Sequence, residues 1–177
     1  MQEPQIIDKP AMTIVGLETP FIHGLSPETN NFKVIPPLWD KLCHRSGEVP
    51  GRIGKAMYGI IYGRPEAERS HREELQYIAG VQARSSAEVP EGMVSRTIPA
   101  GKFAVFLHRG PIQKIGETCY EIYRVWLPQS AWKHAEIADV ELYDVRFECE
   151  GKESEMEYWI SVVPRSTSPS PLGRGPG

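Results

Sequence analysis

An internal repeat is the feature that most constrains the fold of this 177-residue chain. Aromatic residues recur at offsets of about 81 to 87 residues, and each keeps its place in the order strand, helix, strand, strand. The matching pairs are Trp39 with Trp126, Tyr58 with Tyr143, and Tyr77 with Tyr158. Neither half is long enough to bury a sufficient core alone. We therefore expect two related halves that pack sheet against sheet or edge to edge, with a concave seam suited to a ligand.

Hydrophobic periodicity and turn residues place the elements of each half. The predicted class is α+β, a duplicated strand-helix-strand-strand unit with antiparallel sheets and one main helix per half. The first half, about residues 10–84, is expected to hold a strand at Met12–Leu17, a helix from Ser26-Pro27 to about His44 with a kink or second start at Pro36-Pro37, and a hairpin of Ala56–Tyr62 and Glu74–Ala83. The second half, about residues 100–163, is expected to hold a strand at Phe103–His108, a helix at Ile112–Leu127, and strands at Val140–Phe147 and Glu155–Val163, after a short extended piece at Val94–Ile98.

Composition excludes several classes of protein. Twenty Lys and Arg against 23 Asp and Glu give a net charge of −3, which argues against a dedicated nucleic-acid binder. The three cysteines and five histidines form no metal-ligand spacing and no disulfide framework. No signal peptide or membrane-spanning run is evident. We therefore expect a cytoplasmic protein with no cofactor, no metal, no direct nucleic-acid contact and no membrane contact.

The C-terminal segment differs from the rest of the chain. Residues 164–177 are rich in Pro, Gly and Ser and contain no acidic residue. Such a composition buries too little apolar surface to offset the entropy lost on ordering. We therefore expect a single domain over residues 1–163 and a disordered tail over residues 164–177.

Two familiar active-site motifs are incomplete or absent in the sequence. The stretch Gly54-Lys55-Ala56 lacks the earlier glycine and the Ser or Thr of a phosphate-binding loop, and there is no Gly-x-Ser-x-Gly. Glu153, Glu155 and Glu157 alternate along one strand, which favours a solvated outer face. The sequence alone therefore assigns no catalytic residue.

The segment Val140-Glu141-Leu142-Tyr143 carries the strongest functional signal. Alternation along a strand places Glu141 and Tyr143 on one side and the two aliphatic residues on the other. The repeat matches Tyr143 with Tyr58 and Glu141 with Ala56, so the acid occurs in one half only. A carboxylate ringed by aromatics suits a flat, lipophilic cation, because aromatic faces attract positive charge. An exposed Glu beside an exposed Tyr is an equally open interpretation.

Four segments carry a resemblance to a known family. They are Pro99–Phe106 with His108-Arg109-Gly110-Pro111, Tyr123 with Trp126-Leu127-Pro128-Gln129-Ser130, Val140–Tyr143, and Met156–Val163. Over about residues 10–163 the chain resembles the AraC-type effector-binding, or gyrase-inhibitory-protein-like, small-molecule-binding domains. It departs from the usual pattern at Ala131, where the family has Gly after the Ser.

The resemblance implies a pseudo-twofold fold with the ligand in a cleft between the halves. It further implies that Glu141 faces this cleft and attracts cationic, lipophilic drugs and dyes, with aromatics from the second helix and the strands around it. The residues matched by motif are Glu141, Trp126, Tyr123 and Tyr143, and those carried by the repeat are Tyr58, Trp39 and Tyr158. We expect no helix-turn-helix unit in this chain. The leading hypothesis is thus a stand-alone module that sequesters or senses a small cationic aromatic compound.

Two hypotheses from other classes stay open. Some members of the family hydrolyse cyclopropane-bearing compounds, which would require a second acid beside Glu141, with Glu117 or Glu121 as weak choices. The third hypothesis is a protein-binding module that acts on a partner such as DNA gyrase. The chain could be a monomer, or a homodimer through a free strand edge.

Overall fold

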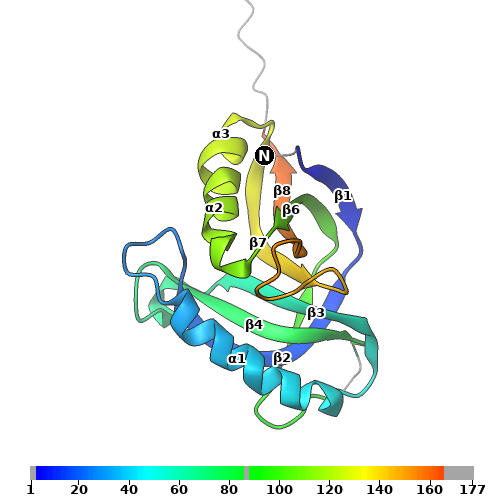
Figure 1. The fold of residues 1–177 in the computed structure, drawn as a ribbon. Helices are drawn as coiled ribbons and strands as arrows, with labels where there is room; N and C mark the ends of the chain where they lie inside the picture. Colours follow the sequence, from blue (N-terminus) through cyan, green and yellow to red (C-terminus); the bar gives the residue numbers. More distant parts are fainter. Residues whose placement is uncertain (1–2, 86–87, 166–177) are drawn as a thin grey trace, which may run out of the picture.

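The computed structural model describes residues 3–85 and 88–165, and their strands form one curled, antiparallel sheet (Figure 1). The sheet has eight strands in the order β1-β6-β8-β7-β3-β4-β2-β5. The strands are β1 (Gln5–Lys9), β2 (Met12–Ile22), β3 (Arg52–Gly63), β4 (Glu74–Ala83), β5 (Val94–Ile98), β6 (Gly101–Arg109), β7 (Trp132–Tyr143) and β8 (Glu155–Pro164). The helices are α1 (Asn31–Arg45), α2 (Ile115–Tyr120), the π-helix η4 (Glu121–Trp126) and α3 (Leu127–Gln129), with short 3-10 turns η1 (Ser46–Glu48), η2 (Glu66–Glu68) and η3 (Ile112–Lys114).

The two halves join edge to edge through their central strands. Strand β3 of the first half pairs with β7 of the second, with Ile60 opposite Val140. The strand that precedes each half pairs with the other half: β1 pairs with β6 of the second half, and β5 pairs with β2 of the first. The duplicated α+β fold is confirmed, and the halves form one continuous sheet rather than two stacked sheets. Strand β1 was not predicted from the sequence.

Helix α1 begins at Asn31, four residues later than the predicted first helical position, Pro27. The Ser26 hydroxyl accepts the backbone N–H of Glu28 and donates to Glu73 at 2.5 Å, so it stabilises a turn ahead of the helix. Such local serine bonds favour turns as well as helix caps. The helix then runs through Pro36 and Pro37 as one element, so no second start occurs there.

Strand β7 begins eight residues before the predicted position and ends at Tyr143, so Phe147 lies in a turn. The pairing of β7 with β8 shifts between His134 and Asp139, and Glu136 adopts a left-handed φ of 57°. A bulge of this kind breaks the alternation of polar and apolar residues. The first part of β7 therefore lacks the alternation from which a strand is predicted.

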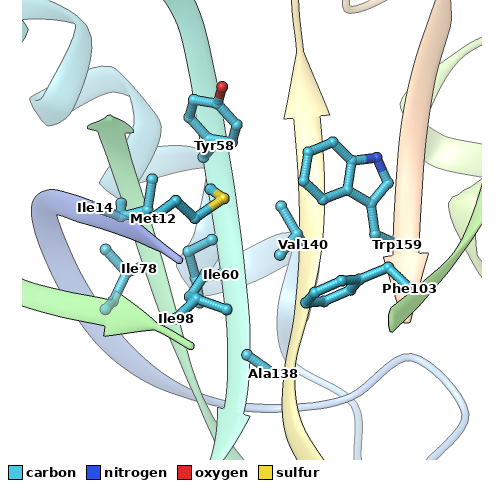
Figure 2. Packing of buried hydrophobic residues seen from close by; sticks show 10 residues of the cluster. All are labelled: Met12, Ile14, Tyr58, Ile60, Ile78, Ile98, Phe103, Ala138, Val140 and Trp159. Carbon is cyan, nitrogen blue, oxygen red and sulfur yellow. The ribbon is translucent and has the colours of Figure 1, made fainter. Parts of the chain in front are cut away.

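The core has two sides because the sheet is buried on both faces. On the face away from the helices, residues from seven strands pack together, including Ile60, Ile78, Val140 and Trp159 (Figure 2). On the other face, α1 covers the first half and α2 with η4 covers the second (Figure 1). Full burial of one such aliphatic side chain contributes about 1.5–3 kcal/mol. Within the described residues, no helix is long and apolar enough to cross a membrane.

The first two residues of the predicted tail belong to the folded domain. Strand β8 includes Pro164, and the Arg165 guanidinium donates to the carbonyl oxygens of Leu127 and Ser130. The remainder of that prediction, residues 166–177, lies outside the described residues.

Candidate functional site

A large cavity of about 1250 Å³ lies over the central strands, with walls from both halves. Helix α1 contributes one wall, and α2 with η4 contributes the other. The sheet contributes residues from β3, β4, β7 and β8. The lining side chains include Trp39, Tyr77, Tyr123, His134, Asp139, Glu141, Tyr143 and Tyr158. Several of them are aromatic, so the cavity combines apolar walls with a few polar groups, as ligand sites commonly do.

Glu141 is the buried acid of this cavity. Its Oε2 accepts a hydrogen bond from the Tyr77 hydroxyl at 2.5 Å and another from the Tyr143 hydroxyl at 2.7 Å. Its Oε1 accepts none from the described residues. Burial raises the pKa of Glu141; the two hydroxyls oppose this rise and nearby Asp139 adds to it. Two phenols thus hold this carboxylate, and no side chain among the described residues forms an ion pair with it.

Three aromatic side chains surround this carboxylate. Trp39 packs edge-on against Tyr143 with ring centroids 5.1 Å apart, and edge-on against Tyr77 at 6.4 Å. The hydroxyls of Tyr77 and Tyr143 both point to Glu141, and burial is the main cause that raises the pKa of each phenol well above its usual value. These tyrosines therefore stay neutral and donate hydrogen bonds at any ordinary pH.

A second acid, Asp139, lies in the same cavity and was not predicted. It is two residues before Glu141 on β7, so both side chains emerge on one face. Asp139 Oδ2 accepts a hydrogen bond from the Tyr123 hydroxyl, and Oδ1 lies 2.8 Å from His134 Nε2. The alternation that identified Glu141 also points to Asp139, but only if the strand is known to extend before Val140.

A family model matches residues 2–163, almost the whole described chain. Its description is "GyrI-like small molecule binding domain". The chain belongs to this family. The predicted resemblance is therefore confirmed.

This GyrI-like domain is similar in sequence to a curated transcriptional regulator. It is 33% identical over 144 residues to the transcriptional regulator BrlR of Pseudomonas aeruginosa, a match that covers 81% of this chain and 48% of the regulator. The chain thus spans about half the length of this curated relative.

Solved structures share the fold at low identity. The structure of SAV2435 bound to tetraphenylphosphonium superposes with a TM-score of 0.71 at 15% identity, covering 92% of this chain and 94% of the other. An integron cassette protein of Vibrio cholerae superposes with a TM-score of 0.64 at 19% identity, covering 92% and 97%. At these identities the likeness shows the common fold alone.

The structure brings together five of the seven predicted site residues of this GyrI-like domain. These five line the cavity and are Glu141, Tyr143, Tyr123, Trp39 and Tyr158. The other two lie elsewhere. Tyr58 packs in the core on the opposite face of the sheet. Trp126 packs edge-on against Phe106 at 5.1 Å and borders a separate groove of about 520 Å³.

The reason for the displacement of Tyr58 is strand register. Tyr58 pairs with Leu142, whereas Met57 pairs with Tyr143. Paired residues of antiparallel strands share a face, so Tyr58 and Tyr143 point to opposite sides. Residues that are equivalent in a repeat share a face, so Tyr58 and Tyr143 are not equivalent, and the match between them was wrong.

Other polar candidates lie outside the cavity. Glu121 borders the groove beside Trp126, and Glu117 is exposed on α2. On β8, Glu157 accepts from Arg146 and from the Trp159 indole, so it is a partly buried bonded residue rather than part of a solvated face. In the part of the chain that the structure describes, no three His, Cys, Asp or Glu side chains converge as a metal site.

Proposed function

We propose that this GyrI-like domain binds lipophilic organic cations in the cavity between its helices, for sequestration or for effector sensing. Glu141 supplies the negative charge, and Trp39 with Tyr143 supplies aromatic surface. The observation that carries the proposal is the Glu141 carboxylate, which is buried in an aromatic-walled cavity and held by two neutral phenols.

Physical chemistry favours a cation with delocalised charge. Leaving a carboxylate in a low-dielectric environment without a counter-charge is costly. A ligand such as a quaternary phosphonium loses little hydration when it leaves water, and its charge offsets this cost. Aromatic faces add cation–π attraction of about 0.5–2 kcal/mol each. The relative that was solved with tetraphenylphosphonium supports the choice of this ion as a probe.

The test is calorimetric titration of the domain with tetraphenylphosphonium. Glu141→Gln keeps the size of the side chain but removes its charge, and we expect affinity to fall by about 10- to 100-fold, the range for a hydrogen-bonded charge. Glu117→Gln, a charge removal on an exposed site of α2, is the matched control and should bind like the wild type.

A second control concerns the ligand. Tetraphenylborate has nearly the same shape as tetraphenylphosphonium and the opposite charge, so we expect it to bind far more weakly. Equal affinity for the two ions, or an unchanged affinity of Glu141→Gln, would contradict the proposal.

A second candidate function is hydrolysis of cyclopropane-bearing compounds in the same cavity. The observation in its favour is Asp139, which provides the second acid on the face that carries Glu141. A carboxyl whose pKa is raised by burial can serve as a general acid or base near neutral pH. Product formation that is lost in Glu141→Gln would support hydrolysis, and binding without turnover would exclude it.

A further inference from the structure

Gly59 lies at the point where the two halves meet beneath the cavity. It pairs with Glu141 of β7 on one side and with Ala79 of β4 on the other, and it is buried. A Cβ atom at this position would lie 2.2 Å from the Tyr77 hydroxyl oxygen, 2.8 Å from its Cζ and 2.4 Å from Glu141 Oε2. Real Cβ atoms essentially never approach other atoms this closely.

The absence of a side chain at Gly59 leaves the space through which the Tyr77 side chain reaches Glu141. Tyr77 is on β4 and Glu141 is on β7, with β3 between them in the sheet. Strands two apart are separated by about 9.5 Å, so a long side chain must cross the intervening strand. The Tyr77 phenol crosses β3 over Gly59, and its hydroxyl arrives 2.5 Å from Glu141 Oε2.

The second half differs at the equivalent position. Tyr77 pairs with Ile61, and Tyr158 pairs with Glu141. Gly59 and Asp139 each precede these partners by two residues, so Asp139 takes the place in the second half that Gly59 has in the first. Of these two equivalent positions, only the one in the first half lacks a side chain. That position, Gly59, pairs with Glu141 of the second half.

We infer that Gly59 is a positioning residue of the cation site: its lack of a side chain lets a tyrosine of the first half complete the carboxylate site of the second. The part of this inference that concerns affinity rests on the proposed function. The part that concerns the Tyr77–Glu141 hydrogen bond does not.

The experiment is a double-mutant cycle with tetraphenylphosphonium as ligand. Gly59→Ala and Tyr77→Phe each remove the same hydrogen bond, so each is expected to weaken binding by about tenfold. The double variant should then be about as weak as either single variant, because the second change has nothing left to remove. The control is Gly101→Ala on β6, where an added Cβ has no neighbour within 4 Å, and it should bind like the wild type. Wild-type affinity in Gly59→Ala, or about a hundredfold loss in the double variant, would overturn the inference.

A measurement without ligand separates this inference from the proposed function. The Tyr77 hydrogen bond lowers the pKa of Glu141, so its loss should raise that pKa, as followed by carboxyl carbon NMR across a pH titration. We expect the same upward shift in Gly59→Ala and Tyr77→Phe and none in Gly101→Ala. If the wild type fails to bind the cation but these shifts appear, the proposed function fails and the positioning role stands. No shift in Gly59→Ala overturns the positioning role.

A folding defect would also be informative. If Gly59→Ala alone unfolds the chain, adding Tyr77→Leu removes both Tyr77 atoms that would lie within 3 Å of the new Cβ and releases Glu141 from the hydrogen bond that holds it there. Recovery of folding in the double variant, measured by circular dichroism, identifies Tyr77 as the obstacle and supports the inference. Failure to recover overturns it.

Discussion

The Trp39 indole N–H donates a hydrogen bond of 3.0 Å to the Tyr77 hydroxyl oxygen. That hydroxyl in turn donates to Glu141, so a helix of the first half supports a carboxylate of the second through one tyrosine. Each donor in the chain polarises the next, which strengthens the bond to the carboxylate. Hydrogen bonds thus link Trp39 in the helical wall of the cavity to Tyr77 and Glu141 on the sheet.

Trp39→Phe should weaken cation binding modestly. The substitution keeps an aromatic ring beside Tyr143 but removes the N–H that supports Tyr77. A neutral hydrogen bond contributes about 0.5–1.5 kcal/mol, so we expect an affinity loss of about three- to tenfold for tetraphenylphosphonium by calorimetry. Trp132→Phe, which borders the separate groove, is the control. An unchanged affinity of Trp39→Phe would show that the indole N–H does not contribute.

Cation binding should weaken in acid at a pH above the usual titration range of a glutamate. Burial raises the pKa of Glu141 above 4.5, and a cation binds the ionised carboxylate. As pH falls below this raised pKa, affinity should drop by about tenfold per pH unit, and above it affinity should reach a plateau. Tetraphenylphosphonium does not titrate, so a pH series of its dissociation constant reports the protein alone. In Glu141→Gln the part of this drop that is due to Glu141 should be absent.

Tyr143→Phe should weaken cation binding, whereas Tyr58→Phe should not. Tyr143 donates to Glu141 at 2.7 Å, and loss of this bond should weaken cation binding by about tenfold. Tyr58 lies on the other face, with its hydroxyl 3.4 Å from Gln82 Oε1, and its loss should leave affinity unchanged. Titration of both variants with the same cation checks this. A loss in Tyr58→Phe equal to that in Tyr143→Phe would contradict the assignment of faces.

The two tyrosines also show how far the repeat could be followed from sequence. It correctly predicted two related halves with one main helix each, because turn residues and apolar periodicity are local signals. It misplaced Tyr58, because it matched Tyr58 with Tyr143 by residue type although their side chains lie on opposite faces of the sheet. Register depends on pairing between distant strands, and similarity of residue type does not reveal it.

The candidate site was predictable to the same limited extent. Glu141 and Tyr143 follow from alternation within one strand. Asp139 was missed because a bulge between His134 and Asp139 interrupts that alternation. Gly59 and Tyr77 carry no local signal of function, since their roles arise from the crossing of β3 by a side chain of β4.

Trp126→Ala should reduce stability and spare cation binding. The indole packs edge-on against Phe106 and is half-buried, outside the cavity. Truncation of a fully buried Trp costs about 3–5 kcal/mol, so a half-buried one should cost about 2 kcal/mol. Chemical denaturation measures this loss, and titration at a temperature where the variant is folded measures affinity. A large loss of affinity with unchanged stability would instead place Trp126 against the ligand.

His134 should stabilise the fold more in mild acid than in base. Burial lowers the pKa of His134, but its hydrogen bond to Asp139 and the charges of Asp139 and Glu136 outweigh this and raise it overall. A histidine with a raised folded pKa adds stability that is complete below its unfolded value of about 6.5 and is lost as pH rises through the folded value. The melting temperature of the wild type should therefore exceed that of His134→Gln by an amount that shrinks across this window. In an Asp139→Asn background the same His134→Gln comparison should show little pH dependence, because the partner of the imidazolium has been removed. A difference that grows with pH would mean that burial, rather than Asp139, controls this imidazole.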